Sequence, residues 1–253
     1  MLIPRVIPQL LVSDESMVKT VRYGDPTYLG DPINVINLFN QFEVDEIALL
    51  DIDATREARP PDMRLLEEMA EECWVPLAYG GGIRTIDEVA AILRLGIEKV
   101  VLGTVAAEDP AFVSAVSDRF GAQAVVVSVD AVDGSDGYDV AVRNATGKLG
   151  TTPAAYARAA QDLGAGEILL NAVPREGTWE GYDLELIRTV AAAVRIPVVA
   201  SGGAASRADL AKPTQEAGAA AAAAGSLFVF GGKGRGVLVN FPERPVLESL
   251  FEH

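Results

Sequence analysis

Carboxylates and lysine are the side chains of this sequence best placed for acid–base chemistry, because its one histidine is His253. We therefore expect no histidine base and no metal site. Asp51 and Asp130 close two predicted strands, and Glu176 follows a third. Burial at a strand end can move the pKa of an acid towards neutrality, where it can transfer protons. The alternative is a helix cap or loop anchor; the residues favour function for Asp130 and leave Asp51 and Glu176 open.

Two apolar segments end in glycines, VPLAYGGGIRT at 75–85 and IPVVASGGAAS at 196–206. Each is typical of a buried strand, since its apolar residues are continuous rather than alternating. Thr85 and Glu88 fit a capping box that opens the following helix. Glycine lets the backbone approach a ligand, and N–H groups at the start of a helix bind anions such as phosphate. A tight turn without a ligand would explain either glycine run taken alone.

The two glycine segments are related by a constant offset. Pro76 and Pro197 are 121 residues apart, as are Glu46 and Glu167. This offset predicts a duplicated half of about 120 residues, with halves near 1–120 and 121–240. It also predicts two similar anion sites on one face, and a ligand with a phosphate at each end is the simplest occupant.

Strand-like and helix-like segments alternate along the whole chain, which predicts an α/β fold closed into a single (β/α)8 (TIM) barrel domain over 1–253. Apolar spacings of three and four, as in Val89, Ile92 and Leu93, indicate the helices. Two long connections, Ser13–Asp31 and Ala131–Thr151, follow strands and are expected to be lids. The expected strands are Arg5–Val12, Glu46–Asp51, Val75–Tyr79, Lys99–Gly103, Ala124–Asp130, Glu167–Asn171, Pro197–Ser201 and Ala219–Ala224.

The composition excludes several classes of partner. A formal net charge of −15 argues against nucleic acid and anionic membranes, which require a basic surface. The apolar start is interrupted by Pro4, Arg5 and Pro8, so we expect a first strand and a cytoplasmic protein. A single cysteine, Cys73, excludes an intrachain disulfide and a cysteine-cluster metal site. No cofactor is expected.

Four charged residues, two basic and two acidic, begin predicted strands. They should meet at the opposite, amino-terminal mouth of the barrel. A ring of salt bridges there is most simply a structural plug. The four are Arg5, Glu46, Lys99 and Glu167.

The chain resembles the cyclase subunit of imidazole glycerol phosphate synthase, a barrel that uses ammonia from a partner glutaminase in histidine biosynthesis. The resemblance runs from Arg5 to about Phe230, through RVIP, MVKT, DEIALLDIDAT, LAYGGGIRT, EKVVLGT, GAQAVVVSVDA, GAGEILL, EGYDLELI and ASGGA. It implies a lyase-type subunit in a heterodimer and a substrate with two phosphates. The implied phosphate-binding residues are Gly81, Gly82, Thr104, Gly202, Gly203 and Ser226.

The resemblance also changes the interpretation of the charged ring, which falls on the gate through which ammonia enters in that family. Glu98 beside the ring falls where the family offers an acid to the partner. Asp130 matches one of the two catalytic aspartates of the family, but Leu11 replaces the other. Glu176 replaces a loop aspartate and Lys19 is kept, so Asp130, Glu176 and Lys19 form the expected catalytic set. Gly103, Ala78 and Pro174 are further departures, from asparagine, threonine and aspartate.

A chain that keeps the ammonia gate but lacks the first acid is similar to a paralogue of the family found with surface-polysaccharide functions. The segments LLDIDATREAR and GSLFVFGGKGRGVLVNFP support this similarity. It implies that the barrel and a glutaminase supply ammonia to a separate amidotransferase acting on an acetamido sugar. Two alternatives stay open: a true cyclase, and a non-catalytic scaffold that binds a phosphorylated molecule and activates the glutaminase.

Overall fold

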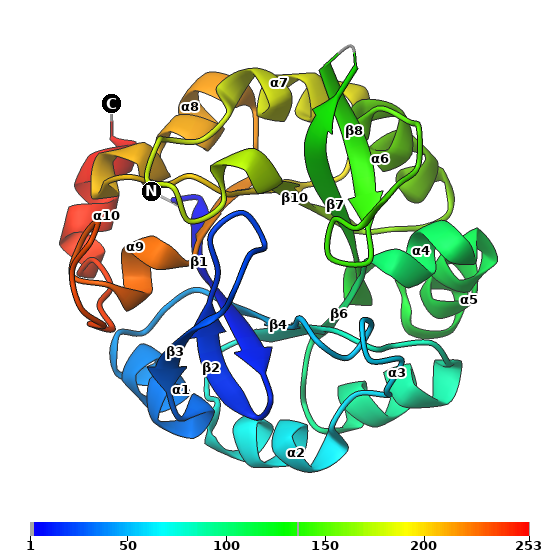
Figure 1. The fold of residues 1–253 in the computed structure, drawn as a ribbon, viewed down its shortest axis with the longest axis horizontal. Helices are drawn as coiled ribbons and strands as arrows, with labels where there is room; N and C mark the ends of the chain where they lie inside the picture. Colours follow the sequence, from blue (N-terminus) through cyan, green and yellow to red (C-terminus); the bar gives the residue numbers. More distant parts are fainter. Residues whose placement is uncertain (1–2, 136, 253) are drawn as a thin grey trace.

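The structure, a computed structural model, describes residues 3–135 and 137–252. His253 lies outside these residues. Eight parallel strands close into a barrel, because β1 pairs with both β4 and β12, and β7 pairs with both β6 and β10 (Figure 1). The expected (β/α)8 fold is therefore confirmed. The barrel strands are β1 (Arg5–Ser13), β4 (Ile47–Asp51), β5 (Leu77–Gly80), β6 (Lys99–Leu102), β7 (Val125–Gly134), β10 (Glu167–Ala172), β11 (Val198–Ser201) and β12 (Ala221–Ala224).

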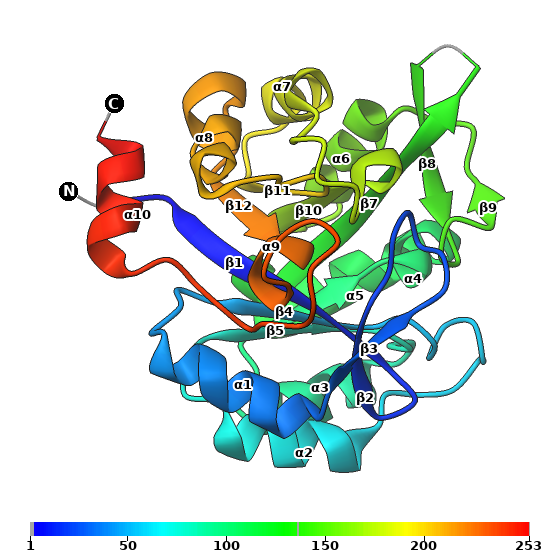
Figure 2. The same ribbon diagram turned by 60° about the vertical axis from the view of Figure 1, so that its left-hand side comes forward.

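Helices surround the barrel, and α10 lies beside the start of β1 (Figure 2). The predicted capping box opens α3: Glu88 N donates to Thr85 Oγ1 at 3.2 Å, and Thr85 N donates to Glu88 Oε2 at 2.9 Å. The α-helices are α1 (Pro32–Gln41), α2 (Met63–Glu72), α3 (Ile86–Arg94), α4 (Thr104–Glu108), α5 (Pro110–Phe120), α6 (Pro153–Asp162), α7 (Leu184–Ala193), α8 (Lys212–Ala217), α9 (Ser226–Val229) and α10 (Arg244–Phe251). Short 3-10 turns are η1 (Ala122–Ala124), η2 (Val173–Arg175) and η3 (Arg207–Leu210).

Alternation along the strands separates two cores. On β1, Val6, Leu10 and Val12 face outwards and pack with the helices, whereas Ile7 faces inwards. Small and branched side chains fill the barrel interior, as the close approach of eight strands requires. The inner core consists of Ile7, Ala48, Ala78, Val101, Val126, Leu169, Val199, Ala221 and Ala223.

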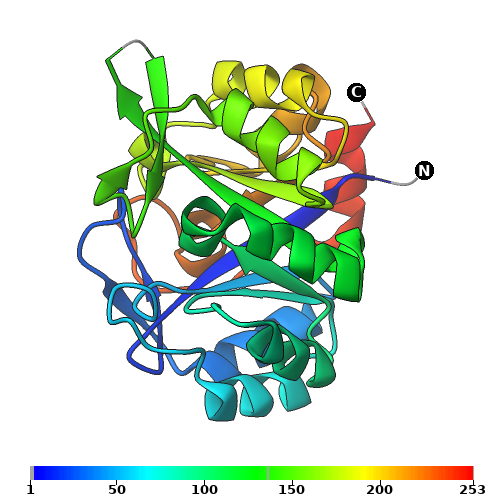
Figure 3. The same ribbon diagram turned by 90° about the vertical axis from the view of Figure 1, so that its right-hand side faces the viewer.

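The two long connections differ from the expectation of simple lids, because each contains strands. Ser13–Asp31 forms an antiparallel hairpin, β2 (Ser16–Lys19) and β3 (Thr27–Gly30), that continues β1. In the second connection β7 runs four residues past Asp130 and pairs with β8 (Gly137–Val142), which pairs with β9 (Gly147–Lys148). Pairing with the protruding barrel strands satisfies their backbone groups. Figure 3 shows both hairpins on the side of the barrel opposite α10.

The 121-residue offset recurs in the strand boundaries. β5 spans 77–80 and β11 spans 198–201, so both ends are shifted by 121 residues. The glycines that follow have positive φ in both halves, 133° at Gly81 and 96° at Gly202. This correspondence supports the predicted duplication, which remains our interpretation of it.

Candidate active site

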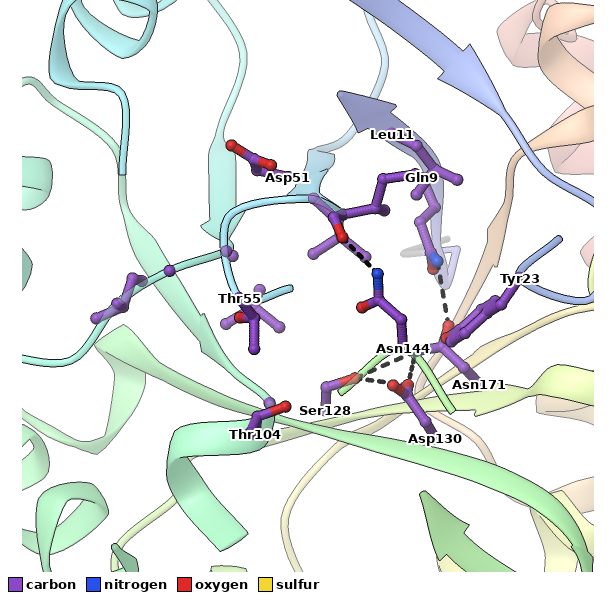
Figure 4. A pocket seen from close by; sticks show the side chains of 18 of the residues that line it. Gln9, Leu11, Tyr23, Asp51, Thr55, Thr104, Ser128, Asp130, Asn144 and Asn171 are labelled. Carbon is purple, nitrogen blue, oxygen red and sulfur yellow. Dashed lines mark hydrogen bonds between the residues drawn. The ribbon is translucent and has the colours of Figure 1, made fainter. Parts of the chain in front are cut away.

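Two neighbouring cavities lie at the carboxyl ends of the barrel strands. The larger has a volume of about 130 Å³ and the smaller about 20 Å³. Gln9, Leu11 and Glu176 line both cavities and so form the boundary between them. Figure 4 shows the larger cavity, with side chains from both halves of the barrel turned towards it. A ligand that occupied both cavities would have to pass this boundary.

The first glycine turn lies in the larger cavity. Gly81 and Gly82 have φ angles of 133° and 69°, and a Cβ on Gly81 would come within 2.6 Å of Asp51 Cβ. Side chains are therefore excluded by the backbone itself, whether or not a ligand binds. Thr104 begins α4 and lines the same cavity, and its Oγ1 accepts a hydrogen bond from Arg143 N at 2.9 Å.

The second glycine turn lies in the smaller cavity. Gly202 and Gly203 have φ angles of 96° and 106°, and a Cβ on Gly203 would lie 2.2 Å from Gly181 O. Ser226 begins α9 and lines this cavity. The structure thus divides the predicted phosphate-binding residues into two sets, and the members of each set line the same cavity. That they bind phosphate remains a prediction.

Asp130 lies on β7 and lines the larger cavity. Its Oδ1 accepts hydrogen bonds from Asn171 Nδ2 at 2.8 Å and Ser128 Oγ at 3.0 Å. Burial raises the pKa of Asp130, and the hydrogen bonds from Asn171, Ser128 and Tyr23 only partly oppose it. Burial and the nearby carboxylate raise the pKa of Tyr23, which keeps its hydroxyl a donor. This environment suits Asp130 to proton exchange, and its catalytic role remains a prediction.

Leu11 is buried on β1, paired with Leu50 of β4 and Val18 of β2. It presents only methyl groups to the two cavities and cannot transfer a proton. Of the other departures, Gly103 lines the larger cavity, Ala78 lies in the inner core, and Pro174 O accepts a hydrogen bond from Arg22 Nε at 3.0 Å.

Lys19 and Glu176 form a buried ion pair between the first hairpin and the loop after β10. Glu176 also accepts hydrogen bonds from Thr20 Oγ1 at 3.1 Å and Tyr23 N at 3.2 Å. Burial lowers the pKa of Lys19 to about 7, whereas contact with the carboxylate favours the charged ammonium. In this structure Glu176 thus holds the connection Ser13–Asp31 in place beside the site. A catalytic role for either residue remains a prediction.

Asp51, whose role the sequence left open, anchors a loop. Its Oδ2 and Oδ1 accept hydrogen bonds from Arg59 Nη1 and Nη2 at 2.8 and 2.9 Å. Its Oδ1 also accepts from the backbone N–H groups of Asp53 and Ala54, both at 3.0 Å. With its oxygens engaged in this way, Asp51 holds the loop after β4 in place, as the structural alternative predicted.

The four predicted charged residues form a closed ring of ion pairs at the amino-terminal mouth. Arg5 contacts both Glu46 and Glu167, and Lys99 Nζ lies 2.9 Å from Glu46 Oε1 and 2.8 Å from Glu167 Oε2. Each acid therefore lies between two cations. Both carboxylates are buried, so removing one cation would leave charge poorly compensated.

Sequence reasoning missed the polar group around Asp130: Ser128, Asn171, Asn144 and Gln9 all line the larger cavity. Gln9 Nε2 donates to Asn171 Oδ1 at 3.1 Å. The available signal was position, since Gln9 is the one polar residue between Val6 and Val12. In the described part of the chain, no group of three or more His, Cys, Asp or Glu residues could hold a metal ion. No helix within 3–135 or 137–252 has the length and apolar character that crossing a membrane requires.

The fold and the acid-bearing cavity define a (β/α)8 barrel of the enzyme type, with its site at the carboxyl ends of the strands. More particularly, the chain belongs to the histidine biosynthesis protein family, whose model matches residues 5–233, and within it to the imidazole glycerol phosphate synthase subunit HisF proteins. This finding agrees with the resemblance that the sequence motifs indicated.

Several relatives match over almost the whole chain. A protein of Leptospira interrogans with the provisional name imidazole glycerol phosphate synthase subunit HisF is 42% identical, covering 99% of this chain and 100% of its own. A Pseudomonas aeruginosa protein, provisionally named subunit hisF2, is 45% identical over 94% of this chain and 96% of its own. The imidazole glycerol phosphate synthase subunit HisF of Hyphomonas neptunium is 41% identical over 91% and 92%.

Proposed function

We propose that this chain is the ammonia-accepting barrel subunit of a glutamine amidotransferase that no longer carries out imidazole ring closure. The observation that carries the proposal is Leu11, which occupies the cavity boundary on β1, across the barrel from Asp130 on β7. By the family resemblance, ring closure uses an acid at each of these positions. Only one of them is present here, whereas the ion-pair ring at the opposite mouth keeps all four members.

The amino-terminal face suits a glutaminase partner. Glu98 is exposed beside the ring, and Trp74, which precedes β5, is 81% exposed. An exposed tryptophan is a typical centre of a protein–protein interface. Beyond the ring, the inner core includes four alanines, and its apolar surroundings favour neutral ammonia over ammonium. Ammonia released by the glutaminase would pass the ring and reach the larger cavity along the barrel axis.

The ligand proposed for the carboxyl-end mouth is small, with an anionic group at each glycine turn. We further propose that the chain is a paralogue serving amidination of a surface-polysaccharide sugar, together with a separate amidotransferase. Two relatives have provisional names with a number, imidazole glycerol phosphate synthase subunit hisF2 of Pseudomonas aeruginosa and subunit hisF3 of Vibrio vulnificus, and a numbered copy is compatible with a paralogue. They are 45% and 43% identical to this chain.

A second candidate function is a true cyclase. The raised pKa of Asp130 favours it, because such an acid could act alone or with Glu176. Growth of a histidine auxotroph that lacks its cyclase subunit separates the two functions. We expect a folded, expressed copy of this chain to give no growth without histidine. Growth at the rate given by an authentic cyclase subunit would overturn the proposal in favour of the cyclase.

A further inference from the structure

Gln9 carries an unpaired buried atom. Among the residues that the structure describes, Gln9 Oε1 is the only buried side-chain nitrogen or oxygen without a hydrogen-bond partner. The side chain is 7% exposed and lines both cavities. A buried acceptor without a partner is costly, so such atoms are uncommon in folded proteins and call for a specific explanation.

Exchanging the oxygen and nitrogen of the Gln9 amide would not remove the problem. Asp130 accepts from Asn171 Nδ2, which leaves Asn171 Oδ1 as an acceptor facing Gln9. Only the Gln9 Nε2 can donate to that oxygen, and it does so at 3.1 Å. The reversed amide would set two acceptors against each other. The chain of hydrogen bonds from Asp130 through Asn171 to Gln9 therefore leaves Gln9 Oε1 without a donor.

The position of Gln9 places this acceptor where the two cavities meet. Gln9 follows Ile7 of the inner core and precedes Leu11 on the same face of β1, since side chains alternate along a strand. Figure 4 shows the side chain reaching from β1 towards Asn171. Oε1 is buried in this structure, but the last torsion of glutamine is broad. A rotation of the amide that lengthens its hydrogen bond to Asn171 would turn Oε1 towards a ligand.

We propose that Gln9 is a specificity-determining residue whose Oε1 accepts a hydrogen bond from a hydroxyl or amino group carried between the two anionic ends of the ligand. The inference rests on the proposed function, because it requires a ligand that spans both cavities. Of the other two residues at this boundary, Leu11 offers no polar atom and Glu176 is already bound to Lys19, Thr20 and Tyr23. Gln9 therefore supplies the recognition there.

The test measures the binding of two bisphosphates by calorimetry. One is the phosphoribulosyl aminoimidazole substrate of the histidine enzyme, which has hydroxyls between its phosphates; the other is an alkane-α,ω-diyl bisphosphate of matching length, which has no donor there. We expect Gln9→Met to weaken binding of the first by about threefold to tenfold, the effect of losing one net hydrogen bond. Binding of the second should stay within about twofold. Gln9→Leu provides a second variant if Gln9→Met does not fold.

Ile7→Val is the matched control, because it lies on the same strand face but lines neither cavity; it should change neither affinity. An unchanged affinity of Gln9→Met for both ligands would overturn the proposal, with an ordered water as the partner of Oε1. Equal weakening of both ligands would also overturn it, because Gln9 would then act on cavity shape alone. Failure of the wild type to bind either bisphosphate would instead contradict the proposed function itself, and this inference with it.

Discussion

Leu11 and Asp130 lie on opposite strands of the barrel. Between β1 and β7 the closed sheet runs through β4, β5 and β6 on one side and through β12, β11 and β10 on the other. Both residues line the larger cavity, so at these two positions β7 offers a polar, hydrogen-bonded acid and β1 offers methyl groups. This asymmetry separates the chain from a barrel with two acids.

Removing one member of the buried Lys19–Glu176 pair should destabilise the protein more than removing both. Lys19→Met leaves a buried carboxylate without its cation, and we expect it to lower the free energy of unfolding by about 3 kcal/mol. Adding Glu176→Met should recover much of this loss, because no buried charge remains. Urea unfolding of both variants measures the difference. Arg64→Met, which breaks exposed pairs with Glu15 and Glu68, is the control and should lower the free energy of unfolding far less. Strictly additive losses would contradict the pairing.

The raised pKa of Asp130 makes stability depend on pH. A carboxyl whose pKa is higher in the folded protein stabilises it fully below the unfolded pKa, about 4, and that stability is lost as the pH rises through the folded value. Asp130→Asn should therefore be more stable than the wild type at neutral pH, with no such gain below about pH 4. Thermal unfolding across this range measures the effect. Asp118→Asn, on the exposed face of α5, is the control substitution. A gain for Asp130→Asn that is independent of pH would rule out the ionisation of Asp130 as the cause.

The sequence was sufficient for the barrel and its glycine turns, because these follow from local patterns. Continuous apolar runs marked the eight strands to within a few residues, apart from the extension of β7 beyond Asp130. The hairpin strands β2, β3, β8 and β9 were missed, since they are short and depend on pairing with protruding barrel strands. The role of Gln9 was also out of reach. Its partner Asn171 is 162 residues away, and an unpaired atom exists only in three dimensions.

Gly81 should not tolerate a side chain. Its φ of 133° is unfavourable for other residues, and a Cβ would come within 2.6 Å of Asp51. We expect Gly81→Ala to reduce the free energy of unfolding by more than about 2 kcal/mol. Gly96, with a φ of 92° but nothing within 4 Å of its Cβ, isolates the backbone effect, and Gly96→Ala should cost about 1 kcal/mol. Equal losses in urea unfolding would show that the close contact carries no extra cost.

Trp74 should be central to glutaminase docking. Trp74→Ala removes a large exposed aromatic group from the amino-terminal face, and we expect it to weaken binding of the partner glutaminase by about tenfold or more. Tyr28→Ala is the matched control: Tyr28 is 66% exposed but lies in β3, in the hairpin on the opposite face. Biosensor titration of both variants against the glutaminase compares the two faces. Weaker binding of the glutaminase by Tyr28→Ala alone would place the interface at the carboxyl-terminal end of the barrel and contradict the prediction.

The most direct test of the account is turnover of the phosphoribulosyl aminoimidazole substrate, with high ammonium salt at alkaline pH so that no glutaminase is needed. The wild type and Leu11→Asp are compared side by side, after both are shown to be folded and to bind the compound. We predict no turnover by the wild type and measurable ring closure by Leu11→Asp, because the substitution restores an acid opposite Asp130. General acid–base catalysis typically contributes about 100-fold to 10,000-fold in rate. Clear turnover by the wild type would contradict the account and identify the protein as a cyclase that works without an acid at residue 11.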